Sequence, residues 1–164
     1  MFCRSGGGGV NITHIEPYPD RLKSLLKPQD FSTLNLYEKR LQEVPLDVFD
    51  VLGQNDILFV DSSHVSKINS DVNKIVFEIL PRLRSGVYVH FHDIGYPFEN
   101  PIPWLREKRG WNEVYLVRSF LAYNTAFEIV FFNNYLGQLY NEEVAKNLPM
   151  AKHYAGISLW IRKV

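Results

Sequence analysis

The sequence predicts an α/β fold built on an open, mostly parallel sheet, from three consecutive elements in the middle of the chain. Asp56-Ile-Leu-Phe-Val60 is a continuous apolar run of strand length, which is typical of a strand buried on both faces of a parallel sheet. Apolar residues at helical spacing follow from Val65 to Leu83, and Gly86 then precedes the β-branched and aromatic run Val87-Tyr-Val-His-Phe91. A strand, a helix and a strand in this order are typical of a crossover unit that joins neighbouring parallel strands.

The other elements follow from alternation, capping residues and breakers along the chain. Val10–Ile15 alternates apolar and polar residues and stops at Glu16-Pro17, which predicts a short strand. In chain order we further predict a helix from Asp20 that Pro28 ends, a strand at Asn35–Gln42, a short helix from Pro45 to a stop at Gly53, a loop at Gly95–Pro103, a helix at Trp111–Tyr123, a strand at Ala126–Phe132, a helix at Gly137–Leu148 and a last strand at Gly156–Ile161.

The composition indicates one globular domain, since 164 residues correspond to about one domain of typical size. The 18 Lys and Arg residues balance the 18 Asp and Glu residues, so neither nucleic acid nor an anionic membrane is an expected partner. The apolar stretches are far shorter than the roughly 20 residues of a membrane-spanning helix. Cys3 is the single cysteine, which excludes an intrachain disulfide and a cysteine-based zinc site. Because the N-terminus also lacks the apolar core of a signal peptide, we expect a cytoplasmic protein.

The N-terminal residues contain a glycine run, Gly6–Gly9, which precedes a predicted strand. A phosphate or dinucleotide cradle requires the opposite order, in which a strand is followed by glycines and then by a helix. We therefore interpret the run as a turn, residues 1–11 as a flexible terminus and residues 12–164 as the folded domain.

Polar residues follow three predicted strands: Glu16, then Asp61 with His64, then His92 with Asp93. In an open parallel α/β sheet, ligands bind beyond the carboxyl ends of the strands. The two oxygens of a carboxylate such as Glu16 suit the two hydroxyls of a ribose. The alternative for Glu16 is a carboxylate that caps the helix beginning at Asp20 or interacts favourably with the dipole of that helix.

Asp61 and Asp93 end two strands that the crossover places side by side, so their carboxylates and the nearby imidazoles are expected to converge. We expect Asp61 and Asp93 to lie close together near His92. Asp61, His92 and Asp93 suit either a magnesium or manganese ion or a general base. The alternative for Asp61 and its two following serines is that they cap a helix beginning near Val65. His90 shares the sheet face of His92 but lies deeper in the strand, which favours a place in the core.

Four segments carry a resemblance to a known family: Ile12-Thr-His-Ile-Glu16-Pro, Val44-Pro-Leu46, Asn55-Asp-Ile-Leu-Phe-Val-Asp61-Ser-Ser-His64 and Gly86-Val-Tyr-Val-His-Phe-His92-Asp93-Ile. They resemble the second, fourth and fifth strand regions of class I S-adenosylmethionine-dependent methyltransferases, and most closely the subgroup called methyltransferase family 24. The closing segment Gly156-Ile-Ser-Leu-Trp-Ile161 resembles the final antiparallel strand of that fold. The resemblance implies a Rossmann-like, mostly parallel sheet with a C-terminal antiparallel strand.

The resemblance also implies roles for individual residues. Glu16 would hold the cofactor ribose, and Gln42 and Glu43 at the end of the third strand would lie near the adenine. Asp61 would face the site of methyl transfer. His64, His92 and Asp93 would position an acceptor hydroxyl, as a base or through a divalent ion. The cofactor implied is S-adenosylmethionine, and the acceptors of such relatives are small molecules or sugars.

One departure from the resembled pattern is that its first strand and glycine-rich loop have no counterpart before Ile12. We expect an N-terminally truncated sheet whose two flanking strands close together or pair with another chain, such as a second copy. We also expect weak binding of S-adenosylmethionine. The predicted function is O-methylation of a small hydroxylated molecule or sugar, and the alternatives are a noncatalytic binding or scaffold domain and a metal-dependent hydrolase.

Overall fold

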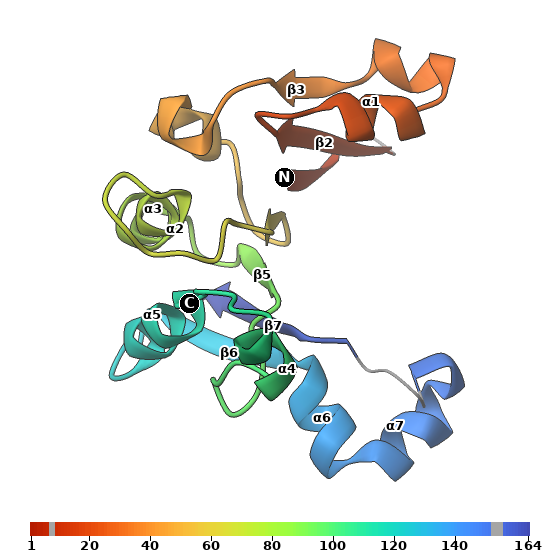
Figure 1. The fold of residues 1–164 in the computed structure, drawn as a ribbon. Coiled ribbons are helices and arrows are strands. Elements are labelled where there is room, and N and C mark those ends of the chain that lie inside the picture. Colours follow the sequence, from red (N-terminus) through yellow and green to blue (C-terminus); the bar gives the residue numbers. More distant parts are fainter. Residues whose placement is uncertain (7–8, 152–155) are drawn as a thin grey trace.

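The computed structural model describes residues 1–6, 9–151 and 156–164. A seven-stranded sheet in the order β3-β2-β1-β4-β5-β7-β6 runs through the molecule (Figure 1). Its strands are β1 (Phe2–Gly6), β2 (Gly9–Ile15), β3 (Asn35–Tyr37), β4 (Ile57–Val60), β5 (Tyr88–His92), β6 (Phe127–Phe132) and β7 (Ser158–Lys163).

Most strands of the sheet point the same way. β2 pairs with β3 in parallel, and β4 pairs with β5 in parallel. β7 is antiparallel to both β5 and β6, and β1 is antiparallel to both β2 and β4. The predicted α/β class, the parallel crossover pair and the antiparallel C-terminal strand are therefore confirmed.

The N-terminal residues differ from the expected flexible segment. Phe2–Gly6 form β1, which lies between β2 and β4 and pairs with both. The inner edges of β2 and β4 are thus hydrogen-bonded within this chain, which satisfies backbone groups that would otherwise be exposed. Gly6 pairs with Gly9 at the end of the sheet opposite to the carboxyl ends of β2 and β4. Residues 7–8, on which the predicted turn falls, lie outside the described residues.

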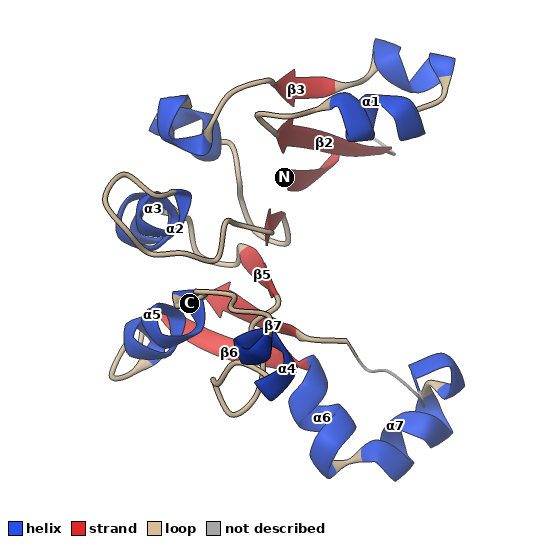
Figure 2. Cartoon of the chain, viewed as in Figure 1, coloured by secondary structure: helices blue, strands red, loops and turns tan. Residues whose placement is uncertain are grey.

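Short helices connect the strands (Figure 2), and none of the helices in the described ranges is both long and apolar enough to cross a bilayer. The α-helices are α1 (Asp20–Leu25), α2 (Asp71–Lys74), α3 (Leu80–Arg82), α4 (Ile102–Arg106), α5 (Glu113–Leu121), α6 (Asn133–Leu139) and α7 (Asn141–Asn147). The 3-10 turns are η1 (Pro28–Ser32), η2 (Leu41–Glu43), η3 (Leu46–Phe49) and η5 (Pro149–Ala151), and the π-helical turn η4 (Ile75–Ile79) joins α2 to α3.

The core lies on one face of the sheet. Alternate side chains of β4, β5 and β7 point into it and pack against the helical segment 71–83, η3 and α5; they are Leu58, Val60, Val89, Phe91, Leu159 and Ile161. On the other face Ile57, Phe59 and Trp160 are half-buried, and His90 is buried between Phe59 and Trp160. This alternation follows from the two-residue period of a strand.

Several predicted elements have different bounds. The helix predicted at Gly137–Leu148 is two helices, α6 and α7, which are separated at Tyr140. The helix expected from Val65 begins at Asp71, because the Ser70 hydroxyl accepts the backbone N–H of Asn73 as its N-cap. The alternative that Asp61 and the two serines after it cap this helix is therefore wrong. The strand expected over Asn35–Gln42 ends at Tyr37, and Gln42 lies in the later turn η2.

Candidate functional site

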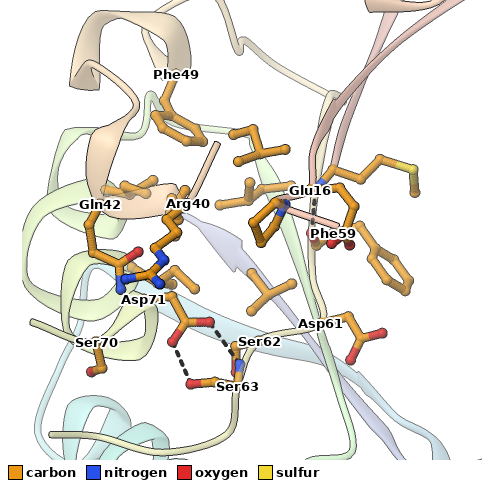
Figure 3. A pocket seen from close by; sticks show the side chains of 18 of the residues that line it. Glu16, Arg40, Gln42, Phe49, Phe59, Asp61, Ser62, Ser63, Ser70 and Asp71 are labelled. Carbon is orange, nitrogen blue, oxygen red and sulfur yellow. Dashed lines mark hydrogen bonds between the residues drawn. The ribbon is translucent and has the colours of Figure 1, made fainter. Parts of the chain in front are cut away.

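A pocket of about 690 Å³ opens at the carboxyl ends of β2 and β4. Such a volume is within the range of small-molecule sites. Glu16, Phe59 and Asp61 lie on its sheet side, and Gln42 and Ser70 face them from the helical side (Figure 3). The position at the carboxyl edge of parallel strands is the one at which open α/β sheets bind ligands.

Glu16 directly follows β2, and its backbone N–H donates to the carbonyl of Tyr37 at 3.1 Å, which fixes it beside β3. Its Oε1 accepts the backbone N–H of Tyr18 at 2.8 Å. α1 begins after Pro19 with no side-chain cap, so Glu16 does not cap this helix. Within the described residues Oε2 of Glu16 accepts no hydrogen bond, and the carboxylate keeps acceptor capacity toward the pocket.

Gln42 and Glu43 are neighbours in η2 but have different surroundings. Gln42 lines the pocket, and its Nε2 donates to the backbone carbonyl of Asn69 at 2.8 Å. Glu43 accepts the backbone N–H of Arg40 at 3.0 Å and is not a lining residue. Of the two residues predicted to lie near the adenine, Gln42 therefore lines the pocket and Glu43 does not.

Asp61 directly follows β4, and its side chain is 58% exposed in the pocket. Behind it, the backbone N–H of Ser63 donates to Asp71 at 2.7 Å, and this bond holds the segment after β4 against the start of α2. The pairing of Val60 with Phe91 puts Asp61 beside the end of β5, where His92 and Asp93 lie. His92 Nε2 is 3.6 Å from Asp93 Oδ1.

His64 lies between two carboxylates. Its Nε2 is 3.6 Å from Asp61 Oδ1, and its Nδ1 is 2.8 Å from Oε2 of Glu113, the first residue of α5. The ring packs on Trp111 with the centroids 4.1 Å apart. His64 has a φ of +57°, in the left-handed region that non-glycine residues seldom occupy. The backbone N–H groups of Asn112 and Glu113 donate to its carbonyl and hold this conformation.

The environment of His64 changes its pKa in two opposing ways. Burial of the imidazole, which is the largest influence, lowers the pKa. The hydrogen bond and charge of Glu113, together with the charges of Asp93 and Asp61, outweigh burial and raise the pKa above its ordinary 6.5. Both strand-end carboxylates, Asp93 and Asp61, therefore lie near enough to His64 for their charges to act on its imidazole.

The metal site expected from Asp61, His92 and Asp93 is not supported. Within residues 1–6, 9–151 and 156–164, no group of three His, Cys, Asp or Glu side chains is arranged to hold an ion. The acids instead form two separate pairs, Asp61 with His64 and Asp93 with His92, each at 3.6 Å.

Glu113 is the site residue that the sequence interpretation did not identify. It is 1% exposed, and its Oε2 accepts from both Ser62 Oγ and His64 Nδ1 at 2.8 Å. One signal was present in the sequence, since Glu113 precedes Val117 by four residues and so shares its helix face. Val117 belongs to the buried core.

Comparison with known proteins gives one match. The family model described as methyltransferase domain, methyltransferase family 24, matches residues 2–94, which is more than half of the chain. No curated protein and no solved structure matched. The matched range contains β1 to β5, the pocket and both acid–imidazole pairs, and it ends just after Asp93. The chain belongs to the methyltransferase domain family.

Proposed function

We propose that this domain transfers a methyl group from S-adenosylmethionine to a hydroxyl of a small molecule or sugar. The observation that supports it most directly is the Asp61–His64 pair at the edge of the pocket, with Asp61 exposed to the pocket and His64 carrying a raised pKa. A base whose pKa lies near the working pH suits removal of a hydroxyl proton. Family membership supports the same class of reaction.

The pocket residues fit the nucleoside half of such a cofactor. Glu16 offers an open carboxylate oxygen for ribose hydroxyls, and Gln42 is held by Asn69 on the opposite wall. S-adenosylmethionine, when bound, supplies an electrophilic methyl group on a sulfonium. The residues of this chain would hold the nucleoside, orient the acceptor and take up its proton.

The proton chemistry belongs to the pairs at the ends of β4 and β5. Asp61 accepts a hydrogen bond from the acceptor hydroxyl in the pocket. As the methyl group is transferred to the hydroxyl oxygen, the hydroxyl proton passes by way of Asp61 to Nε2 of the neutral His64 imidazole, which faces Asp61. The His92–Asp93 pair lies beside them and orients the acceptor. No metal ion is part of this proposal.

The direction of β1 lowers the cofactor affinity that we expect. A glycine loop that approaches the cofactor would follow a strand at the carboxyl edge of the sheet. Here β1 is antiparallel to both neighbours, so Gly6 lies at the opposite edge. The dissociation constant for S-adenosylmethionine should accordingly be well above the micromolar range.

The test is a titration of the full chain with S-adenosylmethionine by calorimetry, followed by transfer of labelled methyl groups to a panel of sugars, phenols and polyols at millimolar cofactor. We expect weak binding and transfer to oxygen, with much less transfer by an Asp61→Asn variant. Binding without transfer to any hydroxyl would contradict the proposal and favour a noncatalytic binding domain. Micromolar binding would contradict the account of β1.

A further inference from the structure

We propose that Glu113 is a positioning residue, which fixes the His64 imidazole with its proton on Nδ1 so that Nε2 faces Asp61. The geometric basis is the 2.8 Å contact of Nδ1 with Glu113 and the 3.6 Å separation of Nε2 from Asp61. The catalytic consequence rests on the proposed function, whereas the orientation of the ring does not. Glu113 lies outside residues 2–94, so α5 adds to the site a carboxylate that the matched region does not contain.

The hydrogen bonds around Glu113 decide which ring nitrogen carries the proton. The backbone N–H of His64 donates to Ser62 Oγ at 2.9 Å, and Ser62 Oγ donates its own proton to Glu113 Oε2 at 2.8 Å. The same oxygen meets His64 Nδ1 at 2.8 Å. A carboxylate oxygen can only accept, so Nδ1 must be the donor and Nε2 is left as the acceptor in the neutral ring.

The burial of Glu113 indicates that packing alone does not explain this residue. It is 1% exposed, and its second oxygen, Oε1, has no hydrogen-bond partner within the described part of the chain. A buried acceptor without a partner costs roughly 1–3 kcal/mol, more when it is charged. An apolar side chain at this position would avoid that cost, and buried ion pairs are often replaced by apolar residues without loss of stability. The interaction with His64 is the specific gain that a carboxylate offers here.

Residues at the start of α5 also contact the main chain and the ring face of His64. The N–H groups of Asn112 and Glu113 donate to the His64 carbonyl at 3.0 and 3.2 Å, and Trp111 covers the ring. Main chain, ring face and Nδ1 of His64 are therefore all contacted by residues 111–113. The charged groups that act on the ring are Glu113 from α5, Asp61 from the segment after β4 and Asp93 from the end of β5.

The test combines Glu113→Leu and Glu113→Gln in the full chain. Nitrogen-15 NMR of the histidine rings, recorded where His64 is neutral, reports which nitrogen carries the proton. We expect Nδ1–H in the wild type and in Glu113→Gln, whose amide oxygen can still accept, and loss of this single form in Glu113→Leu. Val117→Ala is the matched control, because it removes a buried side chain from the same face of α5 but leaves the Glu113 carboxylate in place, and it should keep Nδ1–H.

The kinetic readout separates this proposal from the function on which it rests. Glu113→Leu should lower kcat about 10- to 100-fold with a nearly unchanged KM, and Glu113→Gln should restore part of the rate. An unchanged Nδ1–H form in Glu113→Leu, or a changed form with a wild-type kcat, would overturn the proposal. If Glu113→Leu changes the His64 tautomer but the wild-type protein transfers no methyl group, the positioning role of Glu113 is upheld and the proposed function is contradicted.

Discussion

Two buried histidines, His64 in the segment after β4 and His90 in β5, show how a hydrogen-bond partner affects the pKa of an imidazole. They are 6% and 7% exposed, so burial is nearly equal. Desolvation lowers the pKa of His64, but the hydrogen bond to Glu113 and the charges of Glu113, Asp93 and Asp61 together outweigh it, so the pKa is raised. The pKa of His90 falls to about 4, because desolvation and the nearby His92 act in the same direction and Asp61 opposes them only weakly.

The surroundings of His90 explain why its pKa is lowered while that of His64 is raised. Its ring lies between Phe59 and Trp160, with centroids 4.5 and 4.7 Å away, and its Nδ1 has no hydrogen-bond partner in the described residues. An imidazole among aromatic rings is favoured in its neutral form. His90 is thus buried, as its depth in the strand predicted, but its ring packs on the face of the sheet opposite the core. His64, in contrast, is suited to hold or release a proton near neutral pH.

The first prediction tests the difference between the two histidines by removing Asp61. Its carboxylate raises the pKa of both His64 and His90. For Asp61→Asn we expect methyl transfer to fall by about 10²–10⁴-fold, the usual contribution of a positioned proton acceptor. NMR titration should show a lower pKa for both rings, with His64 still the higher because Glu113 remains. Asp50→Asn is the control, since Asp50 pairs with Arg82 away from the pocket. Near-wild-type transfer by Asp61→Asn would contradict the assignment.

The second prediction concerns stability against pH. Because the pKa of His90 is lowered in the folded state, the unfolded chain binds a proton between about pH 6.5 and 4 and the folded chain does not. The free energy of unfolding should therefore decrease by ~3 kcal/mol as the pH falls through this range. His64 has the opposite sign: its contribution is complete below pH 6.5 and is lost as the pH rises through its raised pKa.

Urea denaturation of the wild type and of His90→Phe, at several pH values, measures this effect. The difference between the two proteins removes the titration of all other groups. We expect the variant to lose less stability on acidification, because phenylalanine keeps the ring packing with Phe59 and Trp160. Parallel pH profiles for the two proteins would show that His90 does not titrate as proposed.

The sequence predicted those parts of the molecule whose structure depends on local pattern. The apolar run at 56–60 and the aromatic run at 87–91 became the central parallel pair β4 and β5. The crossover between them then determined that Asp61 and Asp93 lie at one edge. The start of the intervening helix was less predictable, because Ile68 fits the helical period but is 96% exposed in the loop before Ser70.

Two features depended on contacts between distant residues and could not be predicted from local pattern. β1 has only five residues, and pairing with β2 and β4 defines it as a strand. Glu113 is an acidic residue at a helix start, where exposure is usual, and only the packing of α5 against the sheet places it on His64. The separation of Asp61 from Asp93 into two acid–imidazole pairs likewise depends on side-chain orientation, which the order of the strands does not fix.

The third prediction changes a pocket residue, Glu16, that is not a partner of either histidine. Glu16→Gln removes a charged acceptor from the wall expected to meet the ribose, so the affinity for S-adenosylmethionine should fall about tenfold, or ~1.4 kcal/mol. The pKa values of His64 and His90 should not change. Glu38→Gln is the matched control, because Glu38 pairs with Lys23 outside the pocket. Equal affinities of both variants, measured by calorimetry, would remove Glu16 from the cofactor site.

The smallest expected effects distinguish the adjacent residues Gln42 and Glu43. Gln42→Ala removes a pocket side chain held by Asn69, and we expect the affinity for S-adenosylmethionine to fall two- to fivefold, less than ~1 kcal/mol. Glu43→Ala should leave the affinity unchanged and lower the free energy of unfolding by ~0.5–1.5 kcal/mol, because the backbone N–H of Arg40 loses its acceptor. Calorimetry and urea denaturation on both variants measure the two effects. If Glu43→Ala loses as much affinity as Gln42→Ala, both residues of η2 contribute to cofactor binding. The assignment of Gln42 to the pocket and of Glu43 to the stability of the turn would then be wrong.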